Sequence, residues 1–282
     1  MPRFEYPSLR QGLVFAACPS LGASGSLVVD RSGHGNHGTI FNTAGQSPWQ
    51  PSGGVLGLTF DATNDYADFG TAPACDFGAG NVTISMWARI ASFPGAGALN
   101  RTLLAKGTGN SGVYNGLVIA AFSFSGINYC QCNFGVSGTQ NDTNCAPLAA
   151  NVWYHLCWQV NSGTRFAYLN GVQTDSRAQS GIVNTSGNNL RIGRDSSIST
   201  TYFGGSLDDI RLYSRALTLS EIRLLASRRG IGLTPLPDRA AGLPRKLSVN
   251  VGGTWRPADA YVNVGGAWKL AQASTNVAGT WQ

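Results

Sequence analysis

The chain has 282 residues, and its 37 glycines with only 12% charged residues disfavour a helical bundle, whose surfaces are charged and poor in glycine. The 43% hydrophobic share excludes wholesale disorder. The net charge of +6 is spread along the chain without a basic block, so we expect no nucleic-acid partner, and no apolar stretch reaches the roughly 18 residues of a membrane span.

A polar N-terminal arm over residues 1–11 precedes a body that we expect to span 12–229. Along 82–90 and 152–160 of this body, apolar residues alternate with polar residues, which is the pattern of half-buried strands. Asn170-Gly171 is a strong signal for a tight hairpin. The other predicted strands are 166–169, 190–193 and 207–213.

One helix is predicted near the end of the body. Thr218 and Glu221 have the spacing of a capping box, apolar residues follow them, and Gly230 ends the segment. Many short strands with a single helix predict an all-β fold, either a sandwich or a barrel.

A linker rich in Pro, Gly and Arg is expected over 230–245, and a repeat region follows it over 246–282. Three 13-residue repeats each place Asn-Val, two small residues and then a Trp in the same order. This pattern predicts a strand, a Gly turn and a second strand, which together form a small β-hairpin in each repeat. The three tryptophans are Trp255, Trp268 and Trp281.

The body carries six motifs in order, at Asp30–Thr39, Leu58–Tyr66, Thr83–Trp87, Trp153–His155, Tyr168–Gly171 and Gly205–Leu217. Together they resemble the laminin-G-like and pentraxin-like branch of the concanavalin A-like jelly rolls, over about residues 12–226. Ala62 stands where that family usually has Gly. The resemblance implies an antiparallel two-sheet jelly-roll sandwich, but it says little about activity, because such modules accompany many functions.

The opening segment Gly12–Gly22 and the three repeats resemble parts of tailed-bacteriophage structural proteins. This resemblance implies a non-enzymatic virion protein, assembled in the host cytoplasm, that acts as a surface decoration or a tail-associated adhesin. Trp255, Trp268 and Trp281 would anchor it to other virion proteins or to further copies of the chain, as in a trimer, because aromatic residues dominate interface energies. The alternative is that the repeats form a self-contained cap without a partner.

No catalytic residues are expected. Related sandwich enzymes that hydrolyse glucans use two clustered Glu, whereas this chain has only Glu5 in the arm and Glu221 in the capping box. Asp208 and Asp209 are adjacent on a predicted strand and are therefore expected to face opposite ways. The chain has no HExxH, GxSxG or phosphate-loop motif. We therefore expect no enzyme activity.

The resemblance places the loop that begins at Asp30 beside the last strand of the body. Asp208 shares its predicted strand face with Ile210 and Leu212, so it should point inward, where a carboxylate needs a partner. One hypothesis is a structural Ca²⁺ site formed by Asp30, Asn36, Asp208 and loop carbonyls, because Ca²⁺ prefers oxygen ligands. The alternative is that Asp208 accepts backbone N–H bonds from the loop and no metal binds.

Sugar sites combine aromatic side chains with a few polar groups. Aromatic candidates occur in predicted loops, at strand ends and on the polar face of a strand, and they are Trp49, Trp87, Tyr114, Tyr129 and Tyr202. The alternative is that loops cover Trp87 and that the tyrosines are rim packing. These residues support a second functional hypothesis, in which the chain is an extracellular carbohydrate-recognition module of a cell-surface or secreted bacterial protein. A host surface glycan is the partner considered for such a site.

Six cysteines are present, at positions 18, 75, 130, 132, 145 and 157. The first residues lack the pattern of a secretion signal, so we expect the thiols to be reduced. A bridge from Cys130 or Cys132 to Cys145 is the alternative if the protein meets an oxidising environment.

Overall fold

The structure of the chain is a computed structural model. It describes residues 4–234 other than 23, 42–47, 53, 79, 96–99, 111–112, 136–140, 180–184, 186 and 196–200, together with six strands within 247–281. For residues 55, 108–110 and 113–115 and for the six C-terminal strands, only the backbone is described. Contacts divide the chain into one unit over Phe4–Pro235 and a second that contains Leu236–Gln282.

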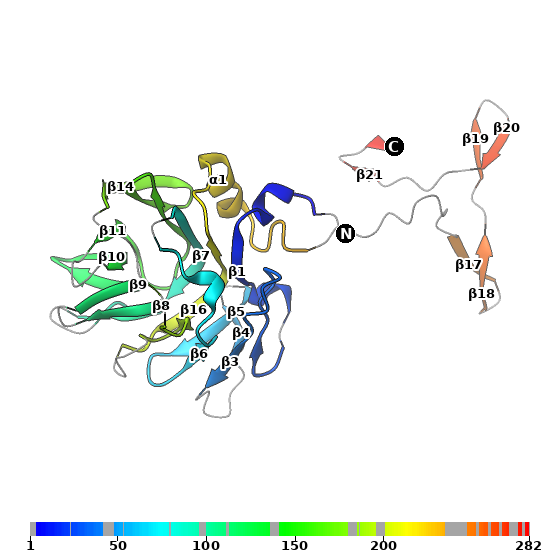
Figure 1. The fold of residues 1–282 in the computed structure, drawn as a ribbon. Coiled ribbons are helices and arrows are strands. Elements are labelled where there is room, and N and C mark those ends of the chain that lie inside the picture. The colour runs from blue at the N-terminus through cyan, green and yellow to red at the C-terminus, as the bar shows by residue number, and fades with distance from the viewer. Residues whose placement is uncertain are drawn as a thin grey trace. The chain divides into compact units, whose positions relative to one another are not determined.

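The first unit is a sandwich of two antiparallel sheets (Figure 1), so the fold that the family resemblance implies is confirmed. The helix-side sheet has the strand order β14-β13-β12-β7-β16-β5-β4, and β1 pairs with β16. Its strands are β1 (Leu13–Ala17), β4 (Trp49–Ser52), β5 (Val55–Asp61), β7 (Val82–Ile90), β12 (Trp153–Asn161), β13 (Thr164–Leu169), β14 (Val172–Ala178) and β16 (Gly204–Tyr213).

The far sheet has the strand order β11-β10-β9-β8-β15-β6-β3-β2. Its strands are β2 (Leu27–Val28), β3 (Gly38–Phe41), β6 (Tyr66–Asp68), β8 (Arg101–Asn110), β9 (Val113–Phe124), β10 (Ile127–Gly135), β11 (Asp142–Cys145) and β15 (Arg191–Ile192). Three short 3₁₀ helices occupy connections, at Pro7–Arg10, Pro19–Leu21 and Pro73–Cys75.

The main core fills the space between the two sheets, and strand alternation builds it. On β7, Val82, Ile84 and Met86 face this core and are almost wholly buried, whereas Thr83 and Trp87 face the other side. Each large apolar side chain buried in this way stabilises the fold by about 1.5–3 kcal/mol.

A second apolar cluster covers the outer face of the helix-side sheet. Helix α1 (Leu219–Ser227) places Ile222 and Leu225 there, the N-terminal arm adds Leu9, and Ile231 and Leu233 follow the helix. The capping box is confirmed, because the Thr218 hydroxyl accepts from the Glu221 N–H. No helix among the described residues is long and apolar enough to cross a membrane.

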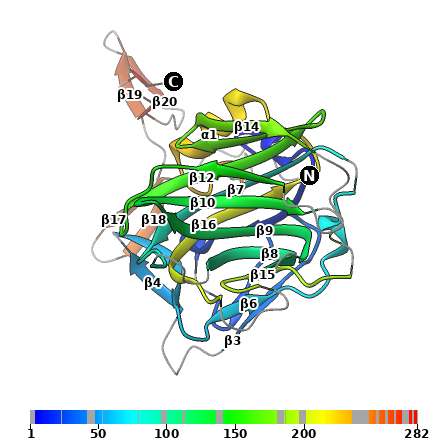
Figure 2. The ribbon, with the colours of Figure 1, turned by 90° about the vertical axis from the view of Figure 1, so that its left-hand side faces the viewer.

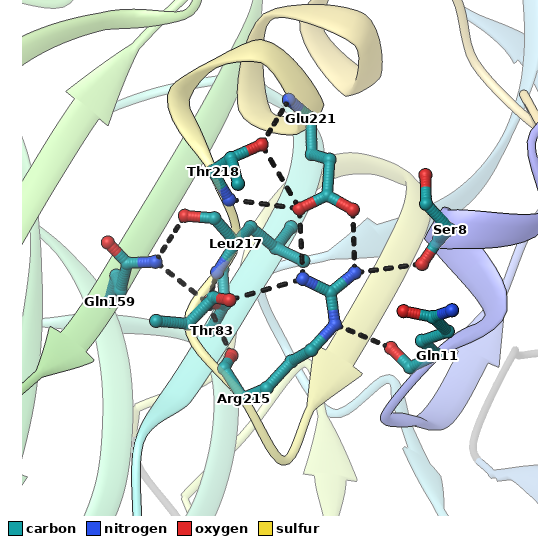
Figure 3. A network of polar contacts seen from close by, with 9 residues as sticks. Ser8, Gln11, Thr83, Gln159, Arg215, Leu217, Thr218 and Glu221 are labelled. Carbon is teal, nitrogen blue, oxygen red and sulfur yellow. Dashed lines mark hydrogen bonds and ion pairs between the residues drawn. The ribbon is translucent and has the colours of Figure 1, made fainter.

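Arg215 joins the arm, the end of β16 and the start of α1 (Figure 3). Its Nε donates to the Gln11 carbonyl at 2.8 Å, and its Nη2 donates to the Ser8 carbonyl at 2.8 Å. Both terminal nitrogens also donate to the Glu221 carboxylate at 2.9 and 2.7 Å, and Nη1 donates to the Ala216 carbonyl. All five guanidinium N–H groups therefore have partners.

The second unit contains three two-stranded hairpins, as the repeats predict. They pair β17 (Leu247–Val251) with β18 (Thr254–Ala258), β19 (Tyr261–Val264) with β20 (Ala267–Leu270), and β21 (Asn276–Val277) with β22 (Thr280–Trp281). In each hairpin the repeat Asn is the register partner of the repeat Trp.

Candidate functional site

The far sheet presents one face to the core and the other away from it. Leu104 on β8, Ile119 on β9 and Cys132 on β10 belong to the main core. Their chain neighbours Ala105, Val118 and Asn133 are register partners of one another and of residues on the flanking strands, so they form rows on the outer face. Figure 2 looks onto these strands, which lie side by side across the front of the sandwich.

Small side chains form the middle of this outer face. Ala105, Val118 and Ala120 are buried at 0%, 5% and 1% exposure, yet none of them belongs to either apolar cluster. Two groups of aromatic side chains lie on the same outer face.

The first aromatic group, which we call the β9–β10 platform, consists of Phe122, Phe124, Ile127 and Tyr129. Register pairs Phe122 with Tyr129 and Phe124 with Ile127. The Phe122 and Tyr129 rings stack with centroids 5.6 Å apart and planes 11° apart. Phe124 is 73% exposed and Ile127 is 53% exposed, so this is a large apolar surface that nothing in the described chain covers.

Polar groups border the platform on β10 and β11. The Gln131 amide donates to the Asp142 carboxylate, which also lies 3.6 Å from Arg177. The side-chain oxygen of Asn144 is buried and has no hydrogen-bond partner among the described residues, and the same holds for the Thr102 hydroxyl. Burial, and after it the Asp142 charge, raises the pKa of Tyr129, whose phenol therefore stays a neutral hydrogen-bond donor.

The second aromatic group lies towards the other edge of the face. The rings of Phe41 and Tyr66 stack with centroids 4.9 Å apart, and the Arg194 guanidinium lies 4.7 Å from the centre of Tyr66 and 5.6 Å from that of Tyr202. Arg191 forms a 2.7 Å ion pair with Asp68 beside them. Four strand spacings, about 19 Å, separate β6 from β10, so one small ligand cannot touch both groups.

The five aromatic residues proposed from the sequence do not form one site. Tyr129 belongs to the β9–β10 platform and Tyr202 to the second group, whereas Trp49 and Trp87 belong to the helix-side sheet. The indole of Trp49 donates to the Gly25 carbonyl. Tyr114 lies on β9, and its side chain is outside the described residues.

The partners of Trp87 agree with the alternative that other segments cover this side chain. Its indole donates to the Leu225 carbonyl at 3.2 Å, and Arg229 lies 4.8 Å from the ring centre. The ring of His155 also packs against it at 5.7 Å. Trp87 therefore holds α1 and the segment after it against the sheet.

Sequence reasoning missed Phe122, Phe124 and Ile127. A usable signal was present, because residues 117–122 form an apolar run and Ser125-Gly126 then forms the turn of a hairpin, with both residues at positive φ. That hairpin places Phe122 directly opposite Tyr129.

A sequence profile described as the concanavalin A-like lectin/glucanases superfamily matches residues 61–223, which is more than half of the chain. The chain belongs to this superfamily. No curated protein sequence matches it.

Solved structures with this lectin-like sandwich include domain 4 of the extracellular GH43 arabinanase of Geobacillus stearothermophilus, in complex with arabinotriose. It has a TM-score of 0.54 and 18% identity, over 76% of this chain and 98% of that chain. The binding domain of Paraclostridial mosquitocidal protein 1 has a TM-score of 0.57 and 19% identity, over 77% of this chain and 52% of that chain. The binding domain of botulinum neurotoxin DC, in complex with SialylT, has a TM-score of 0.57 and 14% identity, over 78% of this chain and 52% of that chain. These likenesses establish the shared fold.

The arrangement of the residues proposed as calcium ligands does not fit a Ca²⁺ site. The Asp30 carboxylate accepts hydrogen bonds from the backbone N–H groups of Ala16, Ser32 and Asn36 and from the Ser32 hydroxyl, at 2.8–3.0 Å. The Asn36 amide donates to the Val14 carbonyl instead of turning an oxygen towards Asp30. N–H and O–H donors thus occupy the places where a cation would need free oxygen atoms.

Asp208 is buried as predicted, but it does not share a face with Ile210 and Leu212. A β-bulge shifts the register between Asp208 and Arg211, and Asp209 has a φ of 45°. Asp208 therefore accepts from the Ser20 N–H at 3.1 Å rather than from the loop that begins at Asp30. The described residues contain no group of three or more His, Cys, Asp or Glu side chains that could hold a metal.

The prediction that Asp208 and Asp209 face opposite ways is wrong, because the bulge turns both carboxylates towards residues 229–230. Asp209 accepts from the Gly230 N–H at 2.8 Å, and Asp208 lies 3.8 Å from the Arg229 guanidinium. Asp209 also forms a buried ion pair with Arg211 at 2.7 Å. Both acids therefore hold the segment after α1 on the sheet.

Proposed function

We propose that this chain is a carbohydrate-recognition module that binds sugar on the outer face of the far sheet, at the β9–β10 platform. The observation that carries the proposal is the stacked pair Phe122–Tyr129, flanked by the exposed ring of Phe124. A sugar ring presents C–H groups that pack on such rings, while its hydroxyl groups need fixed polar partners.

The polar border of the platform supplies such partners. The amide oxygen of Asn144 and the Thr102 hydroxyl have no partner among the described residues. Gln131 lies in the same row of the sheet as both, and it donates to Asp142 in the next row of this face. A ligand or its bridging water can satisfy these atoms. The sugars present in the arabinanase domain and in the neurotoxin binding domain support a ligand of this class.

The proposed module binds without catalysis. Glycoside hydrolysis needs two carboxyl groups that flank the bond to be cleaved. Around the platform, Asp142 is engaged by Gln131 and Arg177, and Asp175 accepts from the Asn144 N–H. The two glutamates pair with Arg228 and Arg215 on the other side of the sandwich.

A glycan array followed by calorimetry on the full chain tests the proposal, with arabinotriose and a sialylated oligosaccharide among the probes. We expect Tyr129→Ala and Phe122→Ala each to weaken binding roughly tenfold or more. Val172→Ala is the matched control, because Val172 is 64% exposed but lies on the helix-side sheet. Absence of binding to every glycan, or equal affinity in all variants, would overturn the proposal.

A second candidate function rests on the three hairpins. Each pairs its Trp with its Asn in the same register, so the same strand pairing occurs three times. In this case the chain is a virion decoration or tail-associated adhesin, and the repeats bind other virion proteins or further copies of the chain. Light scattering on the full chain and on a triple Trp255→Ser, Trp268→Ser, Trp281→Ser variant tests it. A full-chain oligomer that the variant loses supports the anchor, and identical masses speak against self-association.

A further inference from the structure

Three cysteines face the core directly beneath the β9–β10 platform. Cys130 and Cys132 lie on β10 and Cys145 lies on β11, and all three are fully buried members of the main core. They carry free thiols in the structure. Cys130 follows Tyr129 in the chain, so its side chain leaves β10 on the side opposite the platform.

The strand register selects one pair among them. Cys130 is the direct partner of Cys145, whereas Cys132 is the partner of Thr143. The Phe134 N–H donates to the Asn141 carbonyl at 2.8 Å, so these two residues form a hydrogen-bonded pair. Hydrogen-bonded and non-hydrogen-bonded pairs alternate along antiparallel strands, so Cys130 and Cys145, four residues further along each strand, also form a hydrogen-bonded pair. Cα atoms of such a pair lie about 5.5 Å apart, within the range that a disulfide spans. Cys132 is a diagonal neighbour of Cys145, at about 7–8 Å, which is too far.

We propose that Cys130 and Cys145 are a modification site, at which a small-molecule disulfide such as oxidised glutathione converts the two thiols into a reversible disulfide between β10 and β11. The thiolate of one cysteine attacks the glutathione disulfide and releases one reduced glutathione. The thiolate of the other cysteine then attacks the protein sulfur of the mixed disulfide and releases the second. Two electrons pass from the protein to glutathione, and the two thiol protons end on the two glutathione thiols.

The burial of both cysteines determines when the disulfide can form. It raises the pKa of Cys145 to about 12 and that of Cys130 well above its usual value, so the folded protein holds little thiolate. The bond therefore forms as the chain folds, or when β11, an edge strand of only four residues, opens.

The side chains must also move slightly to meet. The Cβ atoms of a hydrogen-bonded pair lie up to about 5.5 Å apart, against roughly 3.5–4.5 Å in a disulfide. The Cys145 thiol, which donates to the Tyr168 carbonyl at 3.3 Å, must rotate away from that partner. A bond that forces such adjustments is reduced more easily than an unstrained structural disulfide.

The experiment refolds the full chain from the reduced, denatured state in oxidised and reduced glutathione, alkylates the remaining thiols after denaturation, and maps the peptides by mass spectrometry. We expect one cross-link, Cys130 to Cys145, with loss of two hydrogen atoms and alkylation of the other four cysteines. Dithiothreitol should remove it, and folded reduced protein should form it far more slowly than refolding protein.

Matched variants separate this pairing from its neighbours. The cross-link should persist in Cys132→Ala and disappear in Cys130→Ala and Cys145→Ala. Six alkylated cysteines in the oxidised wild-type protein, or a bridge from Cys145 to Cys132, would overturn the proposal, and the wild-type result decides even where a variant fails to fold. Glycan binding is not used as a readout, so the result does not depend on the proposed function.

Discussion

At the scale of single residues, His155 is wholly buried and uncharged. Its Nε2 lies 2.9 Å from the Ser85 hydroxyl, and its Nδ1 has no hydrogen-bond partner among the described residues. Burial lowers the pKa of His155 to about 3, well below its value of about 6.5 in an unfolded chain. The imidazole is thus a neutral packing partner of Trp87.

The stability of the fold should consequently fall in acid. Below about pH 6.5 the unfolded chain binds a proton at His155 and the folded chain does not. The free energy of unfolding is therefore unaffected by His155 above pH 6.5, and it decreases as the pH falls from 6.5 towards 3. The slope approaches about 1.4 kcal/mol per pH unit. Urea unfolding at pH 7.5, 6, 5 and 4.5 measures it, and His155→Gln should give a flatter curve. Parallel curves for the two proteins would contradict this origin of the pH dependence.

Lys106 carries a fully buried ammonium group that oxygen atoms surround. It donates to the carbonyls of Thr71, Asn188 and Thr185 and lies 2.9 Å from the Asp76 carboxylate. Lys106→Met removes the cation together with its three hydrogen bonds and its ion pair with Asp76, so we expect a loss of about 2–4 kcal/mol in the free energy of unfolding.

Arg228→Met is the control for Lys106→Met in urea unfolding. Its ion pair with Glu5 is exposed, at 60% and 46% for the two side chains, and should contribute less than about 1 kcal/mol. Equal losses in the free energy of unfolding of both variants would contradict a large stabilising contribution from the contacts of the buried Lys106 ammonium group.

At the scale of elements, Arg215 holds together three segments that are distant in sequence. Lys in its place keeps the charge but cannot serve the Gln11 and Ser8 carbonyls together with both Glu221 oxygens. We expect Arg215→Lys to cost about 2 kcal/mol and to speed hydrogen exchange in residues 7–11 and in α1. Arg177→Lys, at a side chain that is 44% exposed, is the control. Unchanged exchange in the arm would contradict the role given to Arg215.

The strands over 82–90 and 152–160, the capping box and the repeat hairpins could be predicted because each depends on neighbours in the chain. The bulge at Asp208–Arg211 could not, because it is defined only by pairing between β16 and β7. Strict alternation across it therefore assigned Asp208 to the wrong face.

The candidate site divides in the same way. The platform depends on one hairpin, whose apolar run and Ser125-Gly126 turn are readable in the sequence. The second aromatic group brings Tyr66, Arg194 and Tyr202 together from separate segments, and no local pattern reports that. Likewise, only the strand register distinguishes Cys130 from Cys132 as the partner of Cys145.

At the scale of the whole molecule, the two apolar clusters are formed within the sandwich unit, and their described residues run from Leu9 to Leu233. We therefore expect a variant that ends at residue 235 to fold and to show the thermal midpoint of the sandwich transition in the full chain. Calorimetry of both proteins measures this. A clearly lower midpoint in the shortened protein would mean that the hairpins stabilise the sandwich.

Both ends of the sandwich unit pack on one side. Leu9 and Leu233 share the second apolar cluster, and Glu5 pairs with Arg228 at 2.8 Å. This is the outer face of the helix-side sheet, whereas the platform is on the outer face of the far sheet. The first and last described residues of the sandwich unit therefore lie on the face away from the platform. A module tethered through its termini, to a particle or to a longer protein, would display its aromatic face outward, so that attachment and recognition do not compete for the same surface.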